Sequence, residues 1–313
     1  EEKLVKIINE MADYLNIAQM KKLQEVLIKN LSDARPEKEQ ISNEEYLKMF
    51  IEAKQIEGCS ARTLQYYQVT IDHLLKNTDT MIRKITTDEI RTYLAEYQQR
   101  NNCSKVTVDN VRRNISSFFS WLEEEDYILK SPMRRIHKIK TKQPVKEIIS
   151  DEVIERLRDN CRCSRDLAMI DLLYSTGIRV GELVGLNISD IDFEERECVV
   201  YGKGDKERRV YFDAKAKLHL QNYINSRIDT NPALFVTLDS PYERLKISGV
   251  EIRVRELGRK LNIEKIHPHK FRRTMATRAI DKGMPIEQVQ KILGHSQIGT
   301  TMQYAIVNQN NVK

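Results

Sequence analysis

Four short stretches in the second half of the chain hold polar side chains that could act on a phosphodiester. An arginine follows a glycine in YSTGIRVGELVGL, and a lysine lies between two glycines in GKGDKER. A histidine and an arginine three residues apart occupy IHPHKFRRTMATRAI, and in ILGHSQIGTTMQY a histidine lies nine residues before a tyrosine. The six residues concerned are Arg179, Lys203, His269, Arg272, His295 and Tyr304.

These six side chains suit phosphoryl transfer to a tyrosine. Arginine forks can hold the non-bridging oxygens of a phosphodiester and neutralise the charge that grows in its transition state. A tyrosine hydroxyl can attack phosphorus once its proton is removed, and a lysine on a flexible turn can protonate the leaving 5′-oxygen. Histidines can hydrogen-bond the phosphate or take the proton of the tyrosine. Because a covalent phosphotyrosine keeps the energy of the broken bond, the strand can be rejoined without ATP.

Each stretch also has a common structural interpretation when it is taken alone. Lys203 at the tip of a two-stranded ribbon would usually be solvated, and Tyr304 could simply pack in a core. The neighbours His267 and His269 could hold a metal, but the arginines that follow favour an anion. No stretch matches a P-loop or a dinucleotide fingerprint, and no pair of acids is placed for two-metal chemistry. We therefore expect neither a cofactor nor a metal.

In order and spacing, the four stretches resemble the signature boxes of the tyrosine recombinases, also called the phage integrase family. Within that family the chain most resembles bacterial Xer-type and transposon or phage integrases. TGIRVGEL resembles the box of the first arginine and GKGDKERRV the β-hairpin lysine box. HPHKFRRTMAT resembles the H-x-x-R box, and LGHSQIGTTMQY the box that ends in the nucleophile.

The resemblance implies a role for the residue at each of these positions. Arg179 and Arg272 resemble the catalytic arginine pair of the family. Lys203 resembles its general acid, and His269 and His295 resemble its two histidine positions.

Three further positions complete the implied site. Tyr304 resembles the nucleophile that forms a 3′-phosphotyrosine. Glu182 falls where the family often has a supporting acidic residue. Arg273 stands where many members have histidine, which could alter the surroundings of the site.

The implied function is site-specific DNA recombination through a 3′-phosphotyrosine and a Holliday junction, without metal or ATP. We expect integration or excision of a mobile element, with Xer-like chromosome or plasmid resolution and type IB topoisomerase-like relaxation as alternatives. A non-catalytic DNA-binding protein is disfavoured, since all six residues are present. The expected partners are double-stranded recombination sites, further copies of the chain (a dimer on one site and a tetramer in synapsis), and accessory DNA-bending or directionality proteins.

The rest of the sequence predicts a mainly α-helical chain with a small antiparallel sheet in an α+β catalytic domain. We expect an N-terminal helical extension, a core-type (SAM-like) helical DNA-binding domain, a basic linker and the catalytic domain, over residues 1–40, 41–130, 131–146 and 147–313. Strands are predicted at 198–201 and 209–212. The helices of the second region are expected to begin at the capping residues Asn43, Ser60, Thr87 and Ser104.

The segment LKSPMRRIHKIKTKQPVK, residues 129–146, holds seven Lys or Arg and no acid. It is expected to follow DNA phosphates between two domains that form a C-shaped clamp around the duplex. The candidate DNA contacts there and on the preceding helices are Arg62, Tyr67, Lys105, Asn110, Arg113, Arg134, Arg135, Lys138, Lys140 and Lys142.

Composition permits nucleic-acid binding and favours a reducing compartment. The net charge is +6, hydrophobic residues make up 40%, and the five cysteines are scattered. We therefore predict a cytoplasmic, nucleoid-associated protein without disulfides. The first 40 residues are nearly neutral, which favours packing or subunit contact over DNA contact. They also fit a mobile-element integrase with an arm-site domain upstream.

Overall fold

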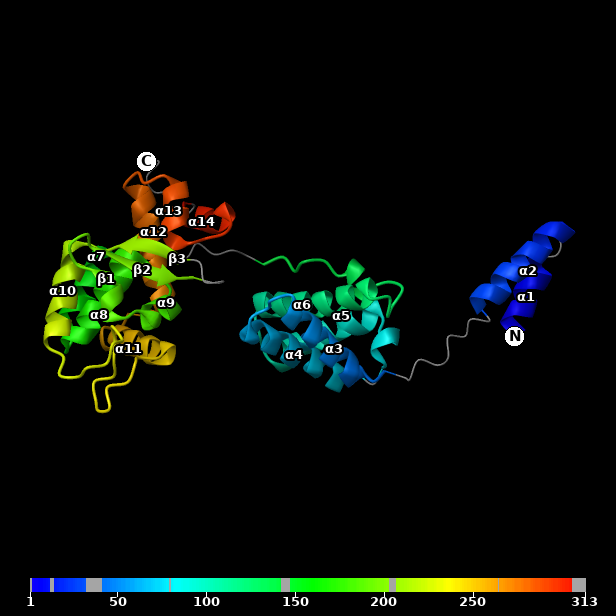
Figure 1. Cartoon of the computed structure of the whole chain (residues 1–313), viewed down its shortest axis with the longest axis horizontal. Helices are drawn as coiled ribbons and strands as arrows, with labels where there is room; N and C mark the ends of the chain where they lie inside the picture. The colour runs from blue at the N-terminus through cyan, green and yellow to red at the C-terminus, as the bar shows by residue number, and fades with distance from the viewer. Residues whose placement is uncertain are drawn as a thin grey trace. The chain divides into compact units, whose positions relative to one another are not determined.

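The computed structural model describes residues 2–11, 14–31, 41–78, 80–141, 147–202, 207–263 and 265–305 (Figure 1). The chain divides into two compact units, Glu1–Lys142 and Gln143–Lys313. Within the described ranges, no helix combines the length and apolar character that crossing a membrane requires. Lys142 and Lys203 lie outside these ranges, so what was expected of them stays a prediction.

The described residues of the first unit form helices and the loops that join them. The α-helices are α1 (Glu2–Met11), α2 (Ile17–Leu31), α3 (Asn43–Ile56), α4 (Ala61–Lys76), α5 (Thr87–Arg100) and α6 (Lys105–Glu124), with short 3₁₀ helices η1 (Ile82–Lys84) and η2 (Pro132–Arg135). Ser60 and Ser104 cap α4 and α6 as predicted, each accepting a backbone N–H of the first turn. The caps of α3 and α5 are Ser42 and Thr86, one residue earlier than expected.

Aromatic rings fill the core between α3, α4 and α6. Phe50 is fully buried, and its ring meets the rings of Phe118 and Tyr67 edge-on, with centroids 5.1 and 5.2 Å away. Tyr67 shares its face of α4 with the buried Ile71 and Leu74, at i+4 and i+7. The ring of the half-buried Tyr67 therefore contributes to the core, and its contact with DNA stays a prediction.

Residues 131–139, within the segment predicted as a linker, pack onto the helical unit. Met133 in η2 is 4% exposed, and Ile136 and Ile139 pack against the same core. The amide of Ile139 also donates to Asp109 Oδ1 at 3.0 Å. Apolar side chains inside the basic run thus anchor this part of the segment and leave its lysines at the surface.

The second unit places helices around a small antiparallel sheet (Figure 1). The helices are α7 (Asp151–Asp159), α8 (Ser164–Thr176), α9 (Val180–Gly185), η3 (Ile188–Asp190), α10 (Ala214–Asn225), α11 (Ile247–Lys260), α12 (Pro268–Asp281), α13 (Ile286–Leu293) and α14 (Ile298–Ala305). The strands are β1 (Ile191–Asp192), β2 (Glu197–Tyr201) and β3 (Glu207–Tyr211), in the order β1-β2-β3. The two predicted strands are thus confirmed within two residues, whereas β1 is too short to show a period in the sequence.

Helix α8 lies at the centre of this unit, with α10 and α12 packed against it. It is buried on nearly all sides, as expected of a helix that is apolar around its circumference. It ends at Gly177, whose φ is +62°. A Cβ atom there would lie 2.4 Å from the Met275 side chain of α12, so glycine permits the close approach of the two helices.

Candidate active site

Arg179 lies in the tight turn between α8 and α9. Its amide donates to Glu182 Oε2 at 2.7 Å, and its Nη1 donates to Glu182 Oε1 at 2.8 Å. Its Nη2 donates to the carbonyl oxygen of Gly294 at 3.1 Å. The Arg179 side chain remains 42% exposed. The guanidinium is therefore oriented from two sides and still open to an anion from solvent.

Arg272 lies in α12 and is only 2% exposed. Its Nη1 donates to Gly177 O at 2.8 Å, and its Nη2 donates to Leu293 O at 2.6 Å and His295 Nε2 at 3.0 Å. None of these acceptors is a carboxylate, and no ion pair to Arg272 occurs within the described ranges. Burial, followed by the charge of Arg179, lowers the pKa of Arg272 to about 10. The side chain is thus a buried cation at neutral pH, which favours an anionic ligand.

His295 follows the glycine that ends α13. Arginine can only donate, so His295 Nε2 must accept the bond from Arg272. The ring proton then lies on Nδ1, which donates to Thr301 Oγ1 at 2.8 Å. Burial and the charge of Arg272 lower the pKa of His295 to about 4. His295 is therefore a neutral imidazole near pH 7, with its Nε2 lone pair accepting from Arg272.

Tyr304 lies in α14, which packs against α12 and α13. The side chain is buried at 6% exposed and belongs to a small apolar cluster that includes Leu293. Its ring stacks on that of His295, with centroids 5.9 Å apart and planes 28° apart. A negative charge on its hydroxyl oxygen would raise the pKa values of Arg272 and Arg273. The ring thus packs in a core, which was one of the two interpretations of Tyr304 from the sequence. Its hydroxyl lies near the two arginines.

Two residues of α12 flank this group. His269 is exposed in the first turn of α12, and its charge contributes to the lowered pKa of His295. Arg273 is 8% exposed, and its Nη1 donates to Glu147 O at 3.3 Å. Burial lowers the pKa of Arg273. The position at which this sequence departs from the family pattern is therefore a second buried cation beside the tyrosine.

Arg208 was not singled out from the sequence, although it lies inside the stretch GKGDKERRV. It donates from Nη1 and Nη2 to the two oxygens of Glu182, at 2.8 and 2.7 Å, and from Nε to Ile292 O at 2.8 Å. The signal that could have found it is the alternation of β3. A period of two places Arg208 on the face of the buried Val210 and Arg209 on the opposite face.

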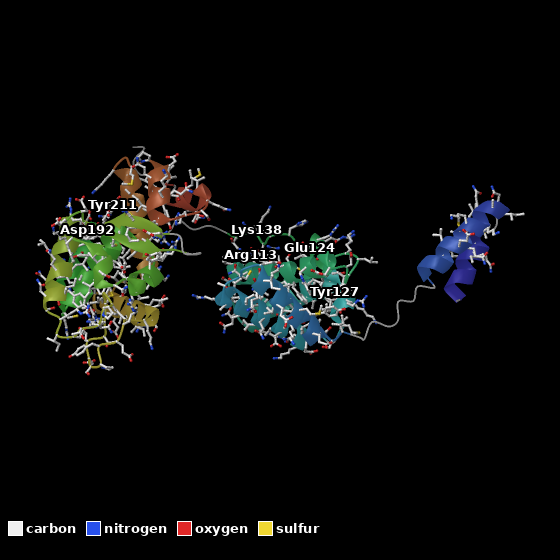
Figure 2. All side chains as sticks on the ribbon, viewed as in Figure 1. Arg113, Glu124, Tyr127, Lys138, Asp192 and Tyr211 are labelled. Atoms are coloured by element: carbon white, nitrogen blue, oxygen red, sulfur yellow. The ribbon has the colours of Figure 1, made fainter. Side chains whose placement is uncertain are left out.

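Most candidate DNA contacts of the first unit are at its surface, and Figure 2 shows Arg113 and Lys138 projecting from it. The Nη2 of Arg134 donates to Glu123 at 2.5 Å, and Asn110 accepts a bond from Arg113. These pairings partly satisfy three candidates. The exposed candidates are Arg62, Lys105, Asn110, Arg113, Arg134, Arg135, Lys138 and Lys140.

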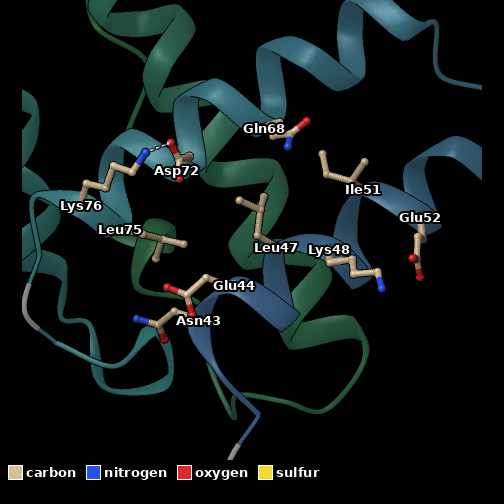
Figure 3. A pocket seen from close by; sticks show the side chains of 10 residues that line it. All are labelled: Asn43, Glu44, Leu47, Lys48, Ile51, Glu52, Gln68, Asp72, Leu75 and Lys76. Carbon is tan, nitrogen blue, oxygen red and sulfur yellow. Dashed lines mark hydrogen bonds and ion pairs between the residues drawn. The ribbon is translucent and has the colours of Figure 1, made fainter.

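Two of the surface hollows, one from each unit, differ in charge. The hollow between α3 and α4, about 630 Å³, carries lysines together with glutamates and an aspartate, and Lys76 pairs with Asp72 at 2.6 Å (Figure 3). A second hollow, about 840 Å³, lies at the end of α11 and in the loop to α12. The basic residues that line it are Arg255, Arg259, Lys265 and His267, and none of the described residues of its lining is acidic. Only the second hollow has the charge that a phosphate backbone requires.

A known protein family matches each of the two units. Residues 147–311 match the Phage integrase family, and residues 46–129 match the phage integrase N-terminal SAM-like domain. The tyrosine recombinase XerC of Oceanobacillus iheyensis is 30% identical to this chain, over 86% of this chain and 93% of that protein.

Solved structures give the same result. The crystal structure of XerA recombinase is 29% identical, with a TM-score of 0.50 over 87% of this chain and 96% of that one. The Tn1549 transposon integrase in complex with a circular intermediate DNA has a TM-score of 0.70 at 18% identity, over 86% of this chain and 99% of that one, and shows the same fold. With a family match over more than half of its residues, the chain belongs to the phage integrase family of tyrosine recombinases, enzymes that cleave and rejoin DNA strands.

Proposed function

We propose that this chain exchanges strands between two matched DNA sites through a 3′-phosphotyrosine at Tyr304. The observation that carries the proposal is the buried guanidinium of Arg272, whose hydrogen bonds within the described ranges go to two carbonyls and a neutral imidazole. Arg179 opens to solvent beside it, and the tyrosine ring stacks on His295. A phosphodiester would supply the missing negative charge next to a nucleophile.

The proposed steps assign each proton and bond. The Tyr304 oxygen attacks the scissile phosphorus, and the bond from phosphorus to the 5′-oxygen breaks as the new ester forms. Arg179 and Arg272 hold the non-bridging oxygens. His295 Nε2 can take the phenol proton once Arg272 donates to the phosphate in place of His295, and Lys203, assigned by resemblance, is suited to protonate the leaving 5′-oxygen. Rejoining reverses these steps when a 5′-hydroxyl from the partner duplex attacks the phosphotyrosine.

The proposed substrate is duplex DNA, gripped mainly through its phosphates. The exposed lysines of the first unit and the basic hollow at the end of α11 support this assignment. The expected C-shaped clamp, a dimer on each site and a tetramer in synapsis belong to the same proposal. Sequence-dependent contacts would come from α4 and α6, through residues such as Arg62 and Arg113.

The relatives favour an Xer-like role over a mobile-element role. XerC proteins match at about 30% identity over most of both chains, whereas the transposon integrase is similar at the level of fold alone. The mobile-element alternative rests on the N-terminal helices α1 and α2. The two roles differ in substrate, since an Xer-like enzyme recombines two alike sites and an integrase joins unlike ones.

A plasmid assay tests the proposal. A binding site is first selected from random duplexes with the Tyr304→Phe variant, and two direct copies are then placed on one plasmid. The wild-type chain should excise the intervening circle, in EDTA as well as in Mg²⁺, and Tyr304→Phe should yield none. Relaxation of a plasmid without sites, in the absence of excision, would instead indicate a topoisomerase. Activity only with unlike sites would favour the integrase role.

A further inference from the structure

Arg208 connects three parts of the candidate site that are distant in the sequence. From β3 its guanidinium reaches Glu182 in α9 with two parallel bonds of 2.8 and 2.7 Å. Its Nε reaches Ile292 O in the last turn of α13 at 2.8 Å. A Cβ atom on Gly294 would lie 3.1 Å from Arg208 Cδ, so the side chain also packs against the turn that leads to His295.

The carboxylate that Arg208 holds is the one that orients Arg179. Glu182 accepts four bonds, two from Arg208, one from the Arg179 side chain and one from the Arg179 amide. Burial alone would raise the pKa of Glu182, but the bonds from Arg208 and Arg179 outweigh it and lower the pKa. Glu182 is thus a fixed carboxylate, each of whose oxygens accepts two hydrogen bonds.

Sharing this carboxylate has an electrostatic consequence. One negative charge lies between two guanidinium groups, so the trio of Arg179, Glu182 and Arg208 keeps a net charge of about +1. Without Arg208, the whole charge of Glu182 would act on Arg179, with which it already pairs at 2.8 Å. Arg179 would then turn toward the acid and lose most of its attraction for a phosphate.

We propose that Arg208 is a positioning residue for strand cleavage, a role that rests on the proposed function of the site. It prevents Glu182 from neutralising Arg179 and holds the end of α13, so that Arg179 and His295 both face the phosphate. Arg208 itself is 12% exposed in its side chain, and its Nε, Nη1 and Nη2 each donate to a protein acceptor, so it need not touch DNA.

The neighbouring Arg209 provides a matched control. It lies one residue away on the opposite face of β3, 65% exposed in its side chain, and pairs with Glu197 at 2.8 Å. Loss of this surface pair should change stability and cleavage little. Arg208→Gln and Arg209→Gln therefore remove the same charge from the same strand and differ in contact with Glu182.

The test compares single-turnover cleavage of a nicked suicide duplex by the wild type, Arg208→Gln, Arg208→Lys and Arg209→Gln. Arg208→Gln should slow formation of the covalent adduct roughly 10- to 100-fold with DNA affinity nearly unchanged. Arg208→Lys keeps the charge without the fork and should be intermediate. Arg209→Gln should match the wild type.

A second substrate distinguishes positioning from general damage to the fold. A methylphosphonate at the scissile position is uncharged and depends less on the charge of Arg179. The deficit of Arg208→Gln relative to wild type should shrink on this substrate. An equal deficit on both substrates, or cleavage by Arg208→Gln at the wild-type rate, would overturn the inference. If the wild type itself forms no adduct at Tyr304, the proposed function fails, and the two failures are thereby distinguishable.

Discussion

Replacing Glu182 with glutamine should destabilise the second unit strongly, because two guanidinium groups depend on this one carboxylate. The Glu182 side chain is 4% exposed and accepts four hydrogen bonds, so its charge is buried and fully paired. Glutamine has a similar shape but offers one acceptor oxygen and no charge. Breaking a buried ion pair by removing one partner costs about 3–5 kcal/mol. For a unit of this size, that corresponds to a fall in Tm of roughly 10 °C.

The pH dependence of this effect follows from the lowered pKa of Glu182. A carboxyl whose pKa is lower in the folded state stabilises the fold fully above its ordinary pKa of 4.5. That contribution is lost as the pH falls from 4.5 through the lower folded value. Glu182→Gln should therefore show a smaller loss of stability on acidification than the wild type, in addition to its lower stability at pH 7.

Calorimetry of the full chain from about pH 3 to about pH 7 measures both effects. Glu197→Gln is the matched control, because its partner Arg209 is 65% exposed and the pair should contribute less than about 1 kcal/mol. Equal Tm values for Glu182→Gln and Glu197→Gln at pH 7 would refute the reasoning. The reasoning would also be refuted if Glu182→Gln lost as much stability on acidification as the wild type does.

Three further predictions concern the turn after α13 and the basic segment. Folding lowers the pKa of His295 from 6.5 to about 4, so this residue makes the free energy of unfolding fall as the pH drops through that range. His295→Gln should remove this part of the fall, as acid titration of unfolding would show. Gly294→Ala should cost about 1–2 kcal/mol in denaturant unfolding, since φ is +63° and Arg208 blocks the Cβ position; unchanged stability would contradict this. Lys138→Ala with Lys140→Ala should reduce the salt dependence of duplex binding by about 2 in log–log slope, measured by fluorescence anisotropy; an unchanged slope would remove both lysines from the phosphate contacts.

Local patterns in the sequence predicted much of the scaffold. The caps Ser60 and Ser104 were predicted from their residue types and accept backbone N–H groups of α4 and α6. The strands predicted at 198–201 and 209–212 match β2 and β3 within two residues. The four stretches with polar residues also predicted that Arg179, Arg272, His295 and Tyr304 meet, and their described contacts bring them together.

Other features depend on contacts between distant segments, which a single sequence does not contain. Arg208 differs from its neighbour Arg209 only by the face of β3 on which it lies, and Glu182 lies 26 residues earlier in the chain. The edge-on packing of Tyr67 in α4 against Phe50 in α3 is another such contact. The neutral state of His295 likewise depends on burial and on Arg272, which is 23 residues away.

The covalent bond between Tyr304 and DNA is the central claim, and one measurement tests it directly. The wild-type chain is incubated with a selected duplex that carries a nick near the cleavage point, so that a short fragment diffuses away and the adduct accumulates. Denaturing gels followed by mass spectrometry of the trapped peptide should show the DNA 3′-phosphate on Tyr304, and Tyr304→Phe should bind the same duplex without an adduct. An adduct on another residue, or an equal yield of adduct from Tyr304→Phe, would contradict the account.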